Sequence, residues 1–199
     1  MPSLLLASSS PYRQALLKKL QLPFISASPE IDESALPGEH ITARVERLAQ
    51  EKAAALASQY PDHWIIGSDQ LCSFQGEQLG KAGTTEAALA QLIRFRGQAV
   101  TFYTGLCLRT PSHNFSCVEP FTVHFRDFTP AEAQSYIALE QPLDCAGSFK
   151  SEGLGITLFE RLEGDDPNSL IGLPLIRLCR FLDSAGCTPL LAARSPATR

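Results

Sequence analysis

The apolar positions near the start of the chain first form a continuous run and then recur at helical spacing. Residues 4–8 begin with an apolar run, which predicts a buried strand. Residues 10–20 then place Leu16, Leu17 and Leu20 on one face of a helix that starts at Pro11. Residues 24–28 predict a short strand, and residues 29–38 form an acidic loop with Pro37 and Gly38.

The middle of the chain combines a long amphipathic segment with an apolar run. Thr42 is suited to cap a helix, and apolar side chains recur at helical spacing as far as Tyr60, before Pro61. Residues 64–69 (WIIGSD) predict a buried strand that ends on the carboxylate of Asp69. Residues 71–74 continue in an extended conformation, and a turn follows at Gly76.

The second half predicts a helix, a hairpin, a second helix, a strand and a final helix. The first helix covers residues 85–95, and the hairpin strands cover 99–108 and 115–125 with alternating apolar positions. Thr129 and Glu132 form a capping-box pattern for a helix that ends near Glu140. A strand at 156–162 and a final helix at 174–185 complete the pattern.

Strands alternate with helices along most of this order, but a hairpin interrupts them. The pattern therefore predicts an α/β fold with a mixed β-sheet and flanking helices. The length of 199 residues fits a single domain, which we assign to residues 1–192, with a flexible tail at 193–199.

Composition narrows the classes of partner. The formal net charge is −4, whereas nucleic-acid polymers and anionic membranes attract basic surfaces, so neither is expected as a partner. The 6 cysteines contain no CxxC pair, which favours buried thiols in a reducing compartment over a zinc site. We find no secretory signal and no apolar run of ~20 residues, so we expect a soluble, cytoplasmic protein.

A cluster of hydroxyl side chains joins the first predicted strand to the first helix. Ser8 and Ser10 precede Pro11, and Arg13 follows one turn later. Ser10 is a good N-cap and Pro11 fits the first helical position. Free backbone N–H groups, the helix dipole and a guanidinium together suit a phosphate group. A capped surface helix is the simpler alternative.

Carboxylates and further cations occur at the ends of other predicted elements. Asp69 ends a strand, where ligands of α/β proteins bind, and Glu33 lies in the acidic loop with Asp32. Carboxylate oxygens suit Mg²⁺, and phosphate-ester cleavage needs cations near the developing charge. The candidate cations are Arg13, Lys52, Lys81 and Lys150. Together these side chains predict a site for a nucleotide polyphosphate, although each lysine alone is commonly a solvated surface charge.

Rival motifs are incomplete. Residues 76–82 resemble a P-loop, but the segment is one residue short and has no Ser or Thr after Lys81. The sequence has no GxSxG segment, and the 4 histidines form no HExxH pattern.

These residues together resemble the Maf family of nucleoside triphosphate pyrophosphatases. The resemblance runs in family order over residues 4–176 and rests on Ser8-Ser9-Ser10-Pro11-Tyr12-Arg13, Asp32-Glu33, Glu51-Lys52-Ala53, Gly67-Ser68-Asp69-Gln70, Gly80-Lys81, Tyr103-Thr104-Gly105 and Gly147-Ser148-Phe149-Lys150-Ser151-Glu152-Gly153.

The resemblance implies a fold related to inosine triphosphate pyrophosphatases and hydrolysis of a nucleoside triphosphate to the monophosphate and pyrophosphate. It implies Asp69 as general base, and Glu33 with Asp69 as ligands of a divalent metal, Mg²⁺ or Mn²⁺. Phosphate-binding roles fall to Ser8, Ser10, Arg13, Lys52, Lys81 and Lys150. A homodimer is implied by the family alone.

Tyr12 departs from the Ser-Pro-Arg-Arg pattern of many members. With Gln70 and Glu152 it resembles the branch that acts on 7-methyl-GTP. Methylation at N7 makes the guanine ring system cationic, and a tyrosine face attracts a cation by about 0.5–2 kcal/mol. Glu152 would accept hydrogen bonds from guanine N1–H and the exocyclic amine. The alternatives are the same reaction on dTTP or UTP, and a non-catalytic nucleotide-binding regulator of cell division.

Overall fold

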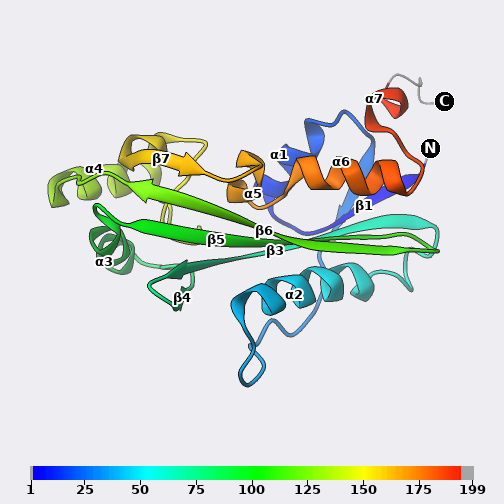
Figure 1. Cartoon of the computed structure of the whole chain (residues 1–199), viewed down its shortest axis with the longest axis horizontal. Coiled ribbons are helices and arrows are strands. Elements are labelled where there is room, and N and C mark those ends of the chain that lie inside the picture. The colour runs from blue at the N-terminus through cyan, green and yellow to red at the C-terminus, as the bar shows by residue number, and fades with distance from the viewer. Residues whose placement is uncertain (1, 194–199) are drawn as a thin grey trace.

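One mixed sheet runs through the protein (Figure 1), in a computed structural model that describes residues 2–193. Its strand order is β2-β1-β3-β5-β6-β7, with β4 paired to β3. β1 is parallel to β2 and β3, and the other pairs are antiparallel. The bounds are β1 Ser3–Ala7, β2 Phe24–Ala27, β3 His63–Phe74, β4 Glu77–Leu79, β5 Ala99–Arg109, β6 Asn114–Phe125 and β7 Phe159–Glu163. The predicted α/β fold with a mixed sheet is confirmed.

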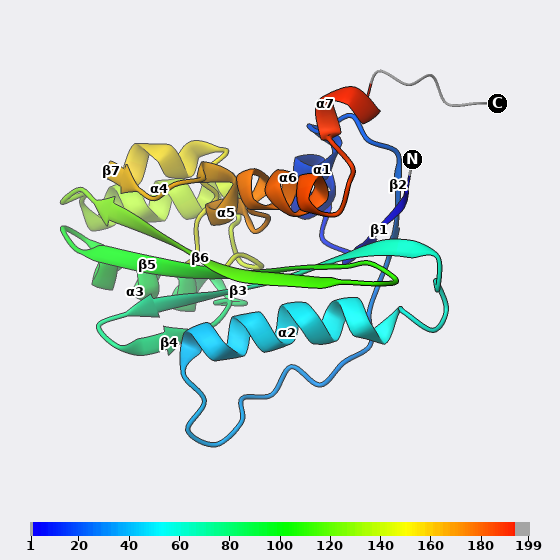
Figure 2. The ribbon, with the colours of Figure 1, turned by 45° about the vertical axis from the view of Figure 1, so that its right-hand side comes forward.

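Helices cover both faces of one half of this sheet. α2 (Ile41–Ala55) lies on one face, and α1 (Pro11–Lys18) and α6 (Leu175–Ser184) lie on the other (Figures 1 and 2). The leucines that give α1 its apolar face join those of α6 and β1 in one buried cluster. A smaller cluster of alanines and aliphatic side chains packs between α2 and the sheet. Both faces are therefore closed by the apolar stripes that the sequence shows.

The other half of the sheet packs on α3 (Thr85–Phe95) and α4 (Pro130–Glu140), which contact each other. Its core is aromatic: Phe125 contacts Phe95, Phe149 and Phe159 with ring centroids 5.3, 5.6 and 5.4 Å apart. Because β3, β5 and β6 are 11 or 12 residues long, they run through both halves and join them rigidly.

Two glycines let α2 lie directly against the sheet backbone. A Cβ atom at Gly67 would lie 2.0 Å from the carbonyl oxygen of Ala49, and one at Gly105 would lie 2.1 Å from that of Val45. Any side chain at either position would push the helix outward. α2 carries Lys52, so this close approach sets the distance between Lys52 and β3.

The pairing of β3 is interrupted along one edge. β1 pairs with residues 63–66 and β4 with residues 72–74. Among the described residues, no strand pairs with 67–71 on that edge, although β5 pairs with them on the other. The chain leaves β1 at Ser8 and β4 at Gly80, so both segments leave the sheet beside this gap. Such an opening between diverging strands is where α/β folds bind ligands.

Several predicted bounds differ from the structure. The N-cap before α2 is His40 rather than Thr42, and the helix ends at Ala55 rather than Tyr60. The strand predicted at 156–162 is a 3₁₀ helix, η1 (Leu154–Leu158), followed by β7.

The sequence pattern also missed short elements: β4, α5 (Pro167–Ile171) and α7 (Pro189–Ala192). They have between 3 and 5 residues, too few for a period to show. Residues 194–199 of the predicted tail lie outside the described residues.

Candidate functional site

The gap beside β3 opens into a cleft of about 520 Å³. This volume is in the range of small-molecule sites, roughly 300–1,000 Å³. Segments that are far apart in the sequence line it: the turn before α1, the loop before α2, β3, the segment after β4 and the loop after α4. Ten of the eleven residues predicted from the sequence line the cleft: Ser8, Ser10, Tyr12, Arg13, Glu33, Lys52, Asp69, Gln70, Lys81 and Glu152.

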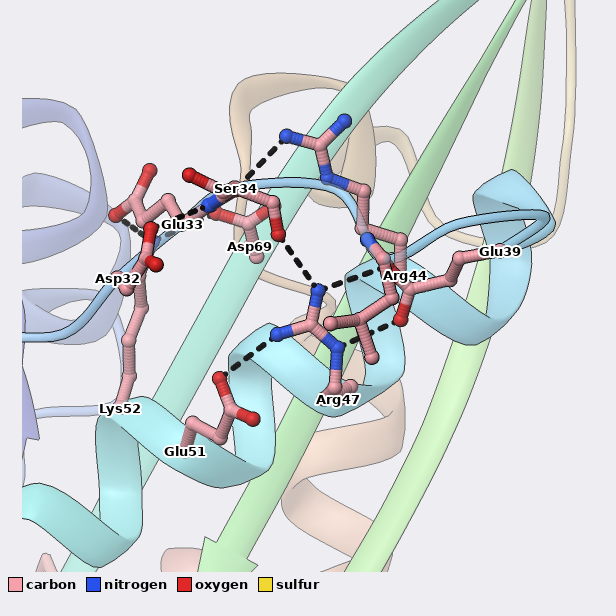
Figure 3. A network of polar contacts seen from close by, with 10 residues as sticks. Asp32, Glu33, Ser34, Glu39, Arg44, Arg47, Glu51, Lys52 and Asp69 are labelled. Atoms are coloured by element: carbon pink, nitrogen blue, oxygen red, sulfur yellow. Dashed lines mark hydrogen bonds and ion pairs between the residues drawn. The ribbon is translucent and has the colours of Figure 1, made fainter.

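Two carboxylates meet at one ammonium group in the cleft (Figure 3). Lys52 Nζ lies 2.6 Å from Asp69 Oδ1 and 2.8 Å from Glu33 Oε1. The side chains of Lys52 and Asp69 are 8% and 9% exposed, whereas the side chain of Glu33 is 57% exposed. Burial raises the pKa of Glu33, but the hydrogen bond and charge of Lys52 outweigh burial and lower that pKa overall. Both carboxylates are thus held towards the same point.

This pair of carboxylates is the part of the site that fits a divalent metal. The described residues contain no group of three or more His, Cys, Asp or Glu side chains arranged as a complete metal site. Mg²⁺ needs only one or two protein carboxylates, because water and substrate phosphates complete its shell. Glu33 and Asp69 would supply those carboxylates, and the Lys52 ammonium, which contacts both, would have to move towards the phosphates.

The turn before α1 forms a cationic wall of the cleft, whose groups are of the kind that suit an anion. Ser10 caps the helix by accepting from the N–H of Arg13 at 3.4 Å, and Ser8 Oγ accepts from the N–H of Ser10 at 3.1 Å. Arg13 Nε donates to the carbonyl of Gly172, 2.8 Å away, at the end of α5. Burial lowers the pKa of Arg13, while Asp69 and Glu33 act to raise it. The guanidinium is therefore fixed near both carboxylates before any ligand binds.

Two further cations reach the cleft from neighbouring elements. Lys81 follows β4, and its backbone pairs with Ala146 in an isolated bridge. Arg44 also lines the cleft, and its Nη2 donates to the carbonyl of Glu33 at 2.8 Å. Sequence reasoning missed Arg44. Its signal was the spacing of eight residues from Lys52, which places both side chains on one face of α2.

Another part of the cleft lining is aromatic and acidic, and we call it the acidic wall. Tyr12, Asp144, Cys145 and Glu152 line it together. Burial raises the pKa of Tyr12 to about 12, helped by Cys145, Asp144 and Glu152. Asp144 was not identified from the sequence, because one aspartate in a loop is an ordinary surface residue. The cleft therefore has a cationic wall and an acidic, aromatic wall.

Gln70 also lines the cleft, and its amide nitrogen is committed to hydrogen bonds within the fold. Its Nε2 lies 3.1 Å from Thr104 Oγ1, and 2.8 and 3.0 Å from the carbonyl oxygens of Ser169 and Leu170. These bonds anchor α5, the short helix that the sequence pattern missed. What Gln70 can offer a ligand is its carbonyl oxygen.

Lys150, the eleventh residue, lies outside the cleft. Its Nζ donates to the carbonyl of Glu140 at 2.9 Å, at the end of α4. The last carbonyls of a helix lack intrahelical partners, so an ammonium group is a favourable cap there. In this structure Lys150 stabilises the loop after α4 and does not line the cleft, so its predicted contact with a phosphate stays a prediction.

The family comparison agrees with this geometry. A model of the Maf-like protein family matches residues 3–185, which include every residue named in the cleft. The chain belongs to the Maf-like protein family. Maf-like proteins are generally nucleoside triphosphate pyrophosphatases that depend on a divalent metal. Within residues 2–193, no helix is both long enough and apolar enough to cross a bilayer.

Proposed function

We propose that this Maf-like protein hydrolyses 7-methyl-GTP to the monophosphate and pyrophosphate, with Mg²⁺ or Mn²⁺, and so clears modified nucleotides from the cytoplasmic pool. The observation that carries the proposal is that three kinds of group line one cleft. These are cationic side chains with a helix start, a pair of carboxylates that share one ammonium group, and an aromatic ring beside further carboxylates. They suit the triphosphate, the metal and water at the scissile phosphorus, and a cationic base, respectively.

The reaction needs a water molecule aligned with the α-phosphorus. Asp69 takes the proton of this water as its oxygen bonds to phosphorus, and the bond from the α-phosphorus to the bridging oxygen breaks. The electron pair leaves with pyrophosphate. A divalent metal at Glu33 and Asp69 would neutralise charge on the phosphate oxygens.

The cationic side chains hold the rest of the triphosphate. Ser8, Ser10 and the start of α1 bind phosphate oxygens, while Arg13, Lys52 and Lys81 stabilise the charge that develops on the leaving group. Arg44 lies close enough to Glu33 to join them. Arg13 and Lys52 belong to helices that pack on the sheet, so their backbone is in place before the triphosphate binds and only their side chains need to move.

The acidic wall favours a cationic purine. The face of Tyr12 attracts the methylated ring system by about 0.5–2 kcal/mol. Glu152 accepts from N1–H and the exocyclic amine, and Asp144 adds a second negative charge beside the ring. A carboxylate at this position repels the carbonyl oxygens of uracil or thymine.

Pyrophosphate release from a panel of nucleotides tests the proposal. We expect kcat/KM to fall in the order 7-methyl-GTP, GTP, then UTP and dTTP, with Mg²⁺ or Mn²⁺ present. Faster turnover of UTP or dTTP would refute 7-methyl-GTP as the preferred substrate but would leave the proposed reaction class intact. Tight nucleotide binding with no product would instead favour a non-catalytic regulator.

A further inference from the structure

Glu33 is the least supported member of the carboxylate pair. It lies in a loop of residues 28–40 without regular secondary structure, and its side chain is more than half exposed. Asp69, in contrast, is buried in the middle of β3. A metal ligand on such a loop must be held in place by contacts elsewhere in the loop.

Besides the hydrogen bond from Arg44 to the carbonyl of Glu33, those contacts come from the guanidinium of Arg47 on α2 (Figure 3). Its Nε donates to Glu39 Oε1 at 2.6 Å, and its Nη2 donates to Glu39 Oε2 at 2.7 Å. The same Nη2 reaches the carbonyl of Ser34, the residue after Glu33, at 3.1 Å. The side chain of Glu39 is 8% exposed, and its Oε2 also accepts from the N–H of Leu36 at 3.1 Å. One arginine thus fastens the loop at two places, 34 and 39.

The helix that carries Arg47 is itself fixed. α2 also carries Lys52, and Gly67 and Gly105 seat the helix against the sheet. The contacts between Arg47 and Glu39, which we call the clamp, therefore attach the loop to α2. The same helix places Lys52 near Asp69.

We propose that Arg47 and Glu39 are positioning residues that keep Glu33 facing Asp69 and so set the affinity of the site for a divalent metal. The inference rests on the proposed function, because it takes Glu33 and Asp69 as the metal ligands. If the clamp opens, the loop samples many conformations and only a fraction holds Glu33 in place. The apparent dissociation constant rises in inverse proportion to that fraction.

Glu39→Gln and Glu51→Gln form a matched pair for the test. Glu51 Oε2 accepts from Nη1 of the same guanidinium at 2.9 Å, but Glu51 belongs to α2 and not to the loop. Each variant removes one negative charge from a side chain that contacts Arg47. The measurements are Mn²⁺ binding by electron paramagnetic resonance, to the protein alone and with a non-hydrolysable nucleoside triphosphate bound, and amide hydrogen exchange of residues 34–40.

We expect Glu39→Gln to weaken Mn²⁺ binding about tenfold, if the competent fraction falls to about a tenth. Exchange in residues 34–40 should become faster, and kcat at saturating Mn²⁺ should stay within about threefold of wild type, because Glu39 touches no reacting atom. Glu51→Gln should match wild type in all three. Arg47→Lys should behave like Glu39→Gln, since lysine cannot form the two-pronged contact.

Equal Mn²⁺ affinities in the two glutamine variants would overturn the inference, as would a loss of kcat that saturating Mn²⁺ does not restore. If the wild type and the Glu39→Gln variant bind Mn²⁺ equally well, the role of the clamp is refuted but the proposed function stays intact. Wild-type protein that binds no Mn²⁺ would refute the proposed metal site itself.

Discussion

Replacing Gly67 by alanine tests whether the seating of α2 on the sheet controls the site. The added Cβ would lie 2.0 Å from the carbonyl oxygen of Ala49 and 3.0 Å from the backbone nitrogen of Ala53. An ordinary carbon–oxygen contact is about 3.3 Å or more, so α2 must move outward by about 1.3 Å. Both neighbours are backbone atoms of the helix, so no side-chain rotation can relieve the contact.

The expected costs follow from this displacement. Overpacking costs about 1–3 kcal/mol, and we expect about 3 kcal/mol because the whole helix is displaced. For a protein of this size, that lowers Tm by about 6–12 °C. Lys52 moves with the helix, away from Asp69. A misplacement of about 1 Å in a catalytic group costs about 100-fold in rate, so the folded variant should lose about that much kcat.

Gly80→Ala is the control, because it lies next to Lys81 in the same cleft and a Cβ there would meet nothing within 4 Å. It should keep wild-type turnover, and its Tm should be equal or slightly higher, since alanine reduces the entropy of the unfolded chain. Thermal unfolding and pyrophosphate release are measured for both variants. Equal Tm values and turnover within twofold for Gly67→Ala and Gly80→Ala would refute the reasoning.

Three further predictions address the carboxylates. Asp69→Asn should lower turnover by roughly 100- to 10,000-fold while nucleotide binding, measured by calorimetry, persists; full activity would remove Asp69 from the mechanism. Asp144→Asn should lower the ratio of kcat/KM for 7-methyl-GTP over GTP by about threefold or more, because the second negative charge beside the cationic ring is lost. An unchanged ratio would exclude that role. The pKa of Glu39 falls from 4.5 to about 2 on folding, chiefly through its hydrogen bonds to Arg47. Its stabilising effect is complete above pH 4.5 and is lost as the pH falls towards 2, so Glu39→Gln should flatten the acid side of a plot of urea midpoint against pH. Parallel plots for the variant and wild type would contradict this.

Much of the fold could be predicted because its signals are local. The apolar run before Ser8 and the leucines of α1 report which faces are buried, and burial decides whether a segment becomes a strand or a helix. The helix starts at Ser10 and Thr129 followed from capping chemistry that involves neighbouring residues only. Where a segment is too short to show a period, as in α5, this source of information is lost.

The site divides in the same way. The sequence by itself determined which groups are available: hydroxyls and Arg13 at a helix start, Asp69 on a buried strand and Glu33 in an acidic loop. The tertiary structure decided which of them meet. Lys52 contacts both carboxylates, whereas Lys150, an equally plausible cation in the sequence, caps α4 at Glu140.

The physical reason is the length and freedom of the side chains involved. A lysine ammonium takes whichever partner the packing of distant segments brings within reach, and the local sequence carries no record of those distances. Glycines at 67 and 105 fix the height of α2, and the pairing of β3 with β1 and β4 leaves the opening beside Asp69. Local pattern thus determined the elements and their chemistry, and long-range packing decided which charges share the cleft.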